Sequence, residues 1–194
     1  MQTIYLGGGC FWCIEAVFQR IRGVVALTSG YMGGQVPHPS YEQVCGKQTG
    51  HAEVVRVEFD DQSLSLSDLF AVFFEVHDPT SLNRQGDDVG PQYRSAIFAT
   101  TDAQLEAARS AMDHWRQTHE GSDPIVTELH RVSPEQAAGT TQEVDKTFFP
   151  AEAYHQNYFN QHPHQGYCAV VVASKVAKSE RAFVRLQVKA PGDQ

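Results

Sequence analysis

The order of apolar and polar residues predicts strands and helices that alternate along the chain. Strand patterns occur at Thr3–Leu6 and in "AEVVRVEFD", "RSAIFATT" and "IVTELHRV", and "GVVALTSGYMGG" reads as a strand that runs into a glycine-rich turn. A further apolar run, "YCAVVVAS", is compatible with a last strand near the C-terminus. These segments together indicate a sheet.

Helical periodicity appears between the predicted strands. It predicts a helix from Phe11 to about Arg22, a long helix in "DAQLEAARSAMDHWRQTHE" and a short one in "EAYHQNYFNQ". In "SLSDLFAVFFEVHD" the apolar residues fall on one face, and Ser67 is the expected N-cap. Alternating strands and helices favour a sheet with helices packed on it, in two layers.

Length and composition indicate one compact domain. The 194 residues, 41% of them hydrophobic, suffice for one sizeable core, and no repeat or long Pro/Ser linker divides the chain. The net charge of -8 argues against nucleic acid or an anionic membrane as partner, because both need clustered lysine and arginine.

The N-terminal segment and the cysteines indicate a compartment. "MQTIYLGGG" has neither the basic start nor the apolar core of a signal peptide, so we expect a cytoplasmic protein. In that compartment the four cysteines, Cys10, Cys13, Cys45 and Cys168, are more often reduced, catalytic or metal-binding than paired as permanent disulfides.

The stretch "IYLGGGCFWCIEAVF" places three glycines and two cysteines between a strand and a helix. It is not a dinucleotide-binding turn, since the sixth position counted from Gly7 is Trp12 rather than glycine. A tight turn that delivers Cys10 to a helix N-terminus remains. Backbone N–H groups and the helix dipole there favour a thiolate and lower its pKa, so Cys10 is a candidate nucleophile. The alternative is a small buried apolar residue.

Two further interpretations use the pair Cys10 and Cys13. C-x-x-C at a helix start is the redox motif of thioredoxin-like domains, but the Gly-Pro pair usual within that motif is absent. A zinc site needs a second ligand pair, for which the sequence offers Cys168 with His162 or His164. A metal- or disulfide-stabilised binding domain is therefore the alternative to an enzyme.

Four motifs resemble those of one family. In order they are "GGGCFWCIEAVF", "GYMGGQVPHPSYEQVCGKQTGHAEVVRVEFD", "FFEVHDPTSLNRQGDDVGPQYRSAIF" and "AEAYHQNYF", and the likeness spans residues 4–176. Together they resemble peptide methionine sulfoxide reductase of type A. The resemblance implies an α+β fold, a two-layer α/β sandwich around a mixed sheet with a ferredoxin-like core. It also implies a catalytic domain at 1–176, followed by a partly flexible tail at 177–194.

The resemblance implies thiol-dependent reduction of methionine-S-sulfoxide, free and in proteins, without metal or organic cofactor. Thioredoxin is the implied reductant, and we expect a monomer with no nucleic-acid or membrane partner. Cys10 corresponds to the nucleophile, Glu53 to the proton donor, and Tyr41 and Tyr93 to two phenols that bind the sulfoxide oxygen. Burial against aromatic rings would raise the pKa of Glu53, whereas a solvated strand-end glutamate would keep its usual value.

The other implied site residues come from the same motifs. Phe11 and Trp12 would form the pocket for the S-methyl group, and Asp88 corresponds to a functional aspartate five positions before Tyr93. "GDD" and Pro91 depart from the family's usual "GND" and threonine, which leaves the geometry of this loop open.

The oxidised Cys10 needs a second thiol to resolve it. Family members commonly use a C-terminal cysteine, which here is Cys168 in the Gly- and Pro-containing segment "HPHQGYC". Cys13, one helical turn from Cys10, is the alternative. Cys45 is expected to be structural, and Met32 has no expected function.

Overall fold

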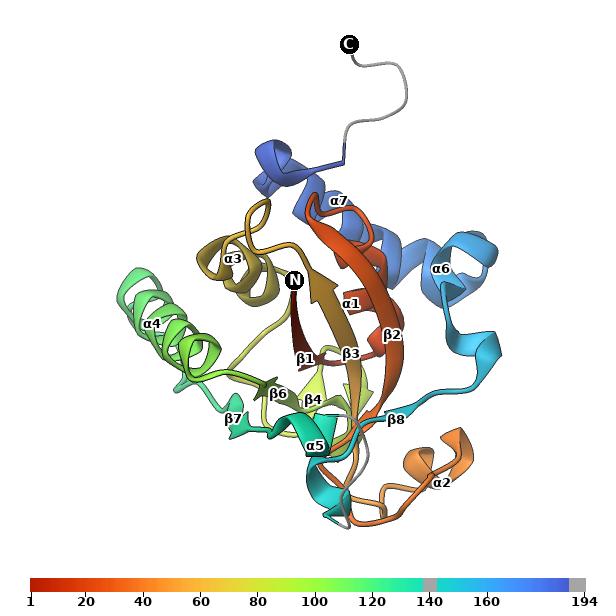
Figure 1. Cartoon of the computed structure of the whole chain (residues 1–194). Helices are drawn as coiled ribbons and strands as arrows, with labels where there is room; N and C mark the ends of the chain where they lie inside the picture. Colours follow the sequence, from red (N-terminus) through yellow and green to blue (C-terminus); the bar gives the residue numbers. More distant parts are fainter. Residues whose placement is uncertain (138–142, 189–194) are drawn as a thin grey trace.

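The computed structural model describes residues 1–137 and 143–188, which form a six-stranded sheet with helices packed on it (Figure 1). The strand order is β7-β6-β1-β3-β2-β8, and β4 pairs with β5 in a separate hairpin. Neighbouring strands are antiparallel except β6 and β7, so the sheet is mixed. The strands are β1 (Gln2–Gly8), β2 (Val24–Met32), β3 (Ala52–Phe59), β4 (Arg84–Gln85), β5 (Asp88–Val89), β6 (Ser95–Ala99), β7 (Glu128–Arg131) and β8 (Phe149–Pro150).

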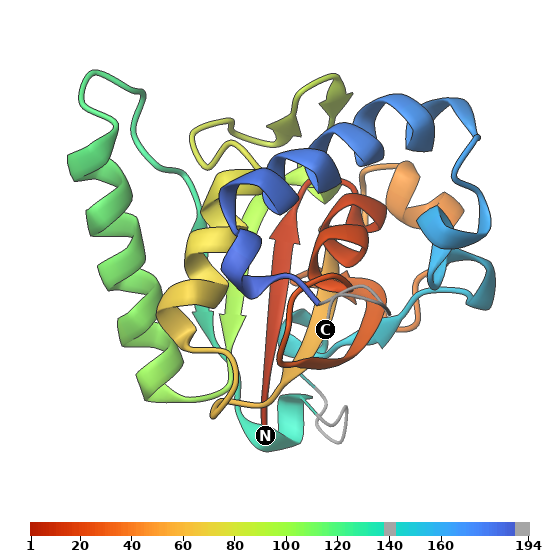
Figure 2. The same cartoon turned by 90° about the horizontal axis from the view of Figure 1, so that it is seen from above.

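Three helices lie together over one face of the sheet, α1, α3 and α7, and α4 packs beside α3 (Figure 1, Figure 2). The α-helices are α1 (Phe11–Phe18), α2 (Tyr41–Cys45), α3 (Leu66–Val76), α4 (Asp102–Thr118), α5 (Pro134–Ala137), α6 (Tyr158–Gln161) and α7 (Ala173–Ala182). Shorter helical turns are η1 (Pro91–Tyr93), η2 (Val144–Lys146), η3 (Ala153–His155), the π-helical η4 (Cys168–Val172) and η5 (Val184–Leu186).

The period-two pattern of the central strands supplies two cores. On β1, Ile4 and Leu6 join the main core beneath the helices, while Tyr5 belongs to a smaller cluster that includes Phe98 and Phe148. Successive side chains of a strand point to opposite faces, so one apolar strand buries residues on both sides of the sheet. The central strands therefore pack against apolar side chains on both faces of the sheet.

The predicted strands from Thr3 to "IVTELHRV" are confirmed, and two helix boundaries differ from the prediction. The first helix ends at Phe18 rather than near Arg22. The N-cap of α3 is Ser65, whose Oγ accepts a hydrogen bond from the N–H of Asp68 at 3.1 Å, so the predicted cap at Ser67 is wrong.

The expected strand in "YCAVVVAS" is wrong, because this run is helical. It forms η4 and leads directly into α7, with Cys168, Val172 and Val176 buried in the main core. The predicted helix in "EAYHQNYFNQ" is two short turns, η3 and α6. Asn157 separates them with a φ of 55°, a left-handed conformation that interrupts a helix.

The C-terminal segment returns to the start of the chain. Helix α7 continues across residue 176, and Val188 N–H donates to the carbonyl oxygen of Arg20 at 2.8 Å. The predicted tail at 177–194 is therefore helical and packed as far as it is described, and residues 189–194 lie outside the described residues. Within the described ranges, no helix combines the length and apolar character needed to span a bilayer.

Candidate active site

A glycine turn joins β1 to α1 and sets the position of Cys10. Gly9 has a φ of 94°, which favours glycine, and a Cβ added there would lie 2.7 Å from Cγ of Gln85. Cys10 follows as the N-cap residue of α1. The strand therefore passes directly into the helix, with the thiol at the helix N-terminus as predicted.

The Cys10 side chain is only 8% exposed, and this burial raises the pKa of its thiol. A hydrogen bond from the backbone N–H of Trp12 at the helix N-terminus acts in the opposite direction but does not outweigh burial. The expectation that the helix N-terminus lowers this pKa is thus wrong, because burial outweighs it and keeps the thiol neutral.

Glu53 projects from β3 toward the same helix N-terminus. Its Oε2 accepts a hydrogen bond from the backbone N–H of Phe11 at 3.0 Å, and the side chain is 2% exposed. Burial raises the pKa of Glu53 to about 8, although the Phe11 hydrogen bond lowers it. The solvated strand-end glutamate is therefore ruled out, and the carboxyl group is mostly protonated at neutral pH.

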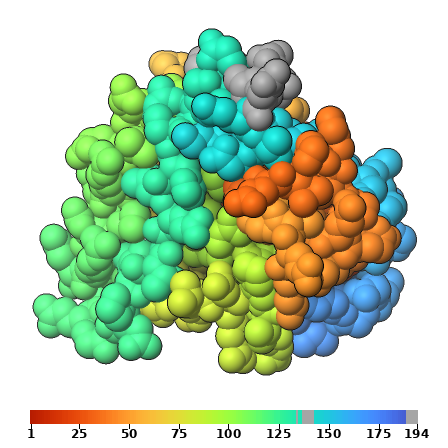
Figure 3. Space-filling model, turned by 90° about the horizontal axis from the view of Figure 1, so that it is seen from below, coloured from red at the N-terminus to blue at the C-terminus, as the bar shows by residue number. Residues whose placement is uncertain are grey.

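A cavity of about 190 Å³ brings the predicted catalytic and substrate-binding side chains together. Its lining residues are Cys10, Phe11, Trp12, Tyr41, Glu53, Asp88, Tyr93 and Tyr167. They come from distant parts of the sequence: Figure 3 shows the segment between β2 and β3 (orange) beside the segment that carries β4 and β5 (yellow-green). Tyr167 is the one lining residue that the sequence reasoning missed.

Two tyrosines enter the cavity from short helical turns. Tyr41 is the first residue of α2, which Ser40 and Gln43 cap reciprocally, and Tyr93 ends η1. Burial raises the pKa of both phenols. Both hydroxyl groups therefore stay protonated and able to donate hydrogen bonds.

Asp88 on β5 is joined to the C-terminal part of the chain. Its Oδ2 accepts a hydrogen bond from the Tyr167 hydroxyl at 2.6 Å, and the same hydroxyl lies 3.8 Å from Sγ of Cys13. Pro91, which departs from the family pattern, begins the η1 turn that carries Tyr93. Tyr167 directly precedes Cys168, so the motif "GYC" was the available signal for it.

The other cysteines do not line the cavity, and all four are free. Cys13 on α1 and Cys168 on η4 are fully buried, and Cys45 is half-buried at the end of α2. Among residues 1–137 and 143–188 no three His, Cys, Asp or Glu side chains form a group that could hold a metal. The zinc arrangement considered from the sequence is not formed there.

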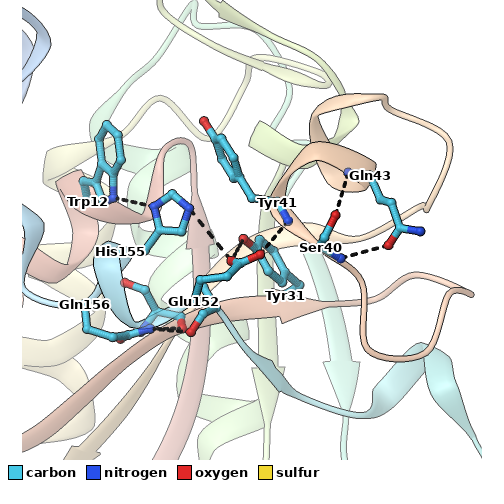
Figure 4. A network of polar contacts seen from close by, with 10 residues as sticks. Trp12, Tyr31, Ser40, Tyr41, Gln43, Glu152, His155 and Gln156 are labelled. Carbon is cyan, nitrogen blue, oxygen red and sulfur yellow. Dashed lines mark hydrogen bonds and ion pairs between the residues drawn. The ribbon is translucent and has the colours of Figure 1, made fainter.

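The aromatic wall of the cavity is held from behind. Trp12 stacks on Tyr158 with ring centroids 3.8 Å apart, and its Nε1–H donates to Nδ1 of His155 at 3.2 Å (Figure 4). Sequence reasoning gave neither His155 nor Tyr158 a role, although both belong to the motif "AEAYHQNYF".

Comparisons with known proteins agree with this geometry. The family model for peptide methionine sulfoxide reductase matches residues 2–187. A peptide methionine sulfoxide reductase MsrA of Polynucleobacter asymbioticus is 50% identical over 96% of this chain and 91% of its own. The MsrA of Deinococcus radiodurans is 52% identical over 94% of this chain and 82% of its own.

Solved structures are similar as well. Methionine sulfoxide reductase A of Corynebacterium diphtheriae has a TM-score of 0.74 and 34% identity, covering 84% of this chain and 76% of its own. Mxr1 from Saccharomyces cerevisiae in reduced form has a TM-score of 0.72 and 33% identity, covering 86% and 88%. On the family model and the near full-length relatives, this chain belongs to the peptide methionine sulfoxide reductase family of oxidoreductases.

Proposed function

We propose that this chain reduces methionine-S-sulfoxide, free and in proteins, to methionine and so repairs oxidative damage. Cys10 is the nucleophile and Glu53 the proton donor. One observation carries the proposal: a buried carboxyl group with a pKa raised to about 8 lies in the same cavity as the thiol. Such a group still holds its proton at neutral pH, which an ordinary glutamate does not.

The reaction needs both groups, because a sulfoxide sulfur is a poor electrophile until its oxygen gains a proton. Glu53 gives its proton to the oxygen while the sulfur of Cys10 attacks the substrate sulfur, and the thiol proton replaces the one that Glu53 has lost. The hydroxyl group then passes to the cysteine sulfur. Methionine leaves, and Cys10 becomes a sulfenic acid that carries the transferred oxygen.

The other residues of the cavity bind the two small groups of the substrate, the sulfoxide oxygen and the S-methyl group, at separate places. The neutral hydroxyls of Tyr41 and Tyr93 donate hydrogen bonds to the sulfoxide oxygen as negative charge develops on it. Phe11 and Trp12 provide an apolar surface for the S-methyl group. Asp88 is engaged by Tyr167 and holds this side of the cavity. Distinct places for oxygen and methyl favour the S epimer.

Regeneration requires a second thiol. We assign it to Cys168, whose sulfur attacks the sulfenic acid, so that a Cys10–Cys168 disulfide forms and water leaves. Thioredoxin then reduces this disulfide by thiol–disulfide exchange. Cys168 is fully buried on η4, so its helix must open locally before the two sulfurs meet. Cys13 remains the alternative because it lies one turn from Cys10.

The connectivity supports the finer fold assignment. The elements β1-α1-β2-β3-α3-β6 give a sheet order β6-β1-β3-β2, a split β-α-β arrangement that we assign as a ferredoxin-like core in a two-layer sandwich. We further propose a cytoplasmic monomer without nucleic-acid or membrane partners; the net charge of -8 supports the absence of these two partners.

The test is an assay with the resolved S and R epimers of methionine sulfoxide and dithiothreitol as reductant. We expect rapid reduction of the S epimer and little reduction of the R epimer. Equal rates on the two epimers would contradict the division of the cavity, and no reduction of either would overturn the proposed function.

A further inference from the structure

Glu152 and His155 take no part in the chemistry above, yet their side chains connect two walls of the cavity. Glu152 precedes the η3 turn, and its carboxylate accepts two hydrogen bonds (Figure 4). Oε1 accepts from the backbone N–H of Tyr41 at 2.8 Å, and Oε2 accepts from the hydroxyl of Tyr31 at 2.9 Å. The carboxylate thus fixes the start of α2, from which the Tyr41 phenol projects.

His155 lies between the same carboxylate and the opposite wall. Its ring is 1% exposed and lies between Tyr41 and Phe11, with centroid separations of 4.5 Å and 5.0 Å. Nδ1 accepts the hydrogen bond from Trp12, so the ring's own proton is on Nε2. Nε2 faces Oε2 of Glu152 at 3.9 Å and makes no hydrogen bond within the described part of the chain.

Together the two side chains form a bridge between the Tyr41 wall, which Glu152 contacts, and the Trp12 wall, which His155 contacts. On one side His155 holds Trp12, which provides the methyl surface. On the other side Glu152 holds the backbone N–H of Tyr41, whose phenol binds the sulfoxide oxygen. The two epimers of a sulfoxide exchange the places of oxygen and methyl, so only one epimer can meet the phenol and the indole together, and only while the two walls keep their relative positions. The Glu152 carboxylate, which receives two hydrogen bonds, fixes the Tyr41 wall, and His155 fixes the Trp12 wall.

We propose that Glu152 and His155 are positioning residues that keep Trp12 and Tyr41 in register and thereby set the epimer selectivity of the enzyme. This assignment rests on the proposed function, because it presumes that the two walls bind methyl and oxygen. It gives the motif "AEAYHQNYF" a role at the reacting end of the substrate rather than in folding alone.

The first test is Glu152→Gln. The amide carries no negative charge, and it presents an NH₂ donor where the carboxylate accepts from Tyr31, so the two contacts weaken. We expect kcat/KM for the S epimer to fall about tenfold, mainly in kcat, because the phenol contact strengthens as charge develops. The rate on the R epimer should stay the same, so the epimer ratio falls by the same factor.

Glu58→Gln is the matched control. It makes the same chemical change at a carboxylate of nearly equal side-chain exposure, 33% for Glu58 against 32% for Glu152. Glu58 is paired with Arg56, away from the cavity. We expect its kinetics and epimer ratio to match the parent protein. A fall in the ratio with Glu58→Gln as large as with Glu152→Gln would overturn the assignment.

His155 is tested with two replacements. Asn offers an oxygen near the place of Nδ1 and can still accept from Trp12, whereas Phe fills the space without an acceptor. We expect His155→Asn to keep most of the epimer ratio and His155→Phe to lose it about tenfold. Equal ratios in both variants and the parent, with only the unfolding temperature lowered, would overturn the proposal.

A spectroscopic readout separates this proposal from the proposed function. The chain has two tryptophans, so Trp115→Phe leaves Trp12 alone and the protein's tryptophan emission then reports on that ring. In that background we expect His155→Phe to shift the Trp12 emission maximum and make it easier to quench with acrylamide, while Glu58→Gln does neither. An unchanged emission overturns the bridge. An inactive parent protein with the emission shift present overturns only the proposed reaction.

Discussion

Cys10 and Glu53 are buried together, and burial favours the neutral form of each. The structure therefore does not hold a ready thiolate at the helix N-terminus, which is what the sequence alone predicts. It holds a protonated acid beside a protonated thiol. On the proposed mechanism, the acid is ready to protonate a substrate oxygen, and the thiol becomes reactive as its proton leaves during the attack.

Cys10→Ser should abolish sulfoxide reduction, because a hydroxyl group is a far weaker nucleophile than a thiolate. The free energy of unfolding should change by about 1 kcal/mol or less, since serine is close to cysteine in size. Turnover with dithiothreitol and a denaturant titration measure the two effects. Substantial remaining turnover would remove Cys10 as the nucleophile.

Glu53→Gln should slow the sulfoxide-reducing step by about 10²–10⁴-fold, because the amide keeps the Phe11 hydrogen bond but has no acidic proton. Single-turnover measurements isolate this step from recycling. A rate equal to that of the parent protein would make Glu53 a structural residue.

The same substitution should change how stability depends on pH. The pKa of Glu53 rises from an ordinary 4.5 to about 8 on folding, so between these values the folded state binds more protons than the unfolded state. Stability from this group is complete below pH 4.5 and is lost as the pH rises toward 8. Glu53→Gln removes that loss and should be more stable than the parent at pH 8 by on the order of 4 kcal/mol.

The pH comparison is made by denaturant titration at pH 4.5 and pH 8. The gain should nearly vanish at the lower value, where the parent protein's glutamate is protonated in the folded state and half protonated in the unfolded state. A stability difference of equal size at both values would show that Glu53 titrates normally.

The sequence predicted the residues that line the cavity better than those that hold them in place. Cys10, Glu53 and the two tyrosines lie inside motifs, whereas Tyr167 and Glu152 act through hydrogen bonds to partners that are 79 and 111 positions away along the chain. Nothing in the local pattern around Glu152 points to Tyr41. Such pairings arise only from the fold.

At the scale of elements, α3 shows how a local signal can be misplaced by two residues. Ser65 and Ser67 are both exposed serines at the helix start, and the structure uses Ser65 as the cap. Ser65→Ala should therefore cost about 1 kcal/mol of stability, and Ser67→Ala close to nothing. Thermal unfolding of the two variants measures this, and activity should stay unchanged. Equal losses, or a larger loss at Ser67, would contradict the assigned cap.

The strands were predictable because successive side chains of a strand point to opposite faces of the sheet, which leaves a period of two in the sequence. The helix in "YCAVVVAS" was not predictable from local pattern, since three successive valines fit a strand locally and only tertiary packing decides for a helix. One signal for the helix was available: Cys168, Val172 and Val176 recur at a spacing of four, and these are the residues buried in the main core.

At the scale of the whole molecule, the chain end folds back over its beginning. Helix α7 and η4 contact α1, so Cys168 lies in the same core as Cys10 but outside the cavity. The proposed resolving role of Cys168 therefore requires an opening of the C-terminal segment, and the π-helical η4 is where that segment carries Cys168.

One turnover without reductant should leave a Cys10–Cys168 disulfide. Cys168→Ser should keep that single turnover but lose recycling by thioredoxin, because the sulfenic acid then has no partner. Peptide mapping by mass spectrometry identifies the bridge. A Cys10–Cys13 product, with normal recycling in Cys168→Ser, would transfer the role to Cys13.

The neutral, 8% exposed thiol of Cys10 also bears on survival under the conditions in which such an enzyme is needed. Hydrogen peroxide reacts with exposed thiolates and carries them past the sulfenic stage to irreversible sulfinic acid. A thiol kept protonated and covered is a poor target for peroxide. On the proposed mechanism, its oxidation instead awaits a sulfoxide that fits the cavity and accepts a proton from Glu53, so the thiol would stay reduced in surroundings that oxidise methionine.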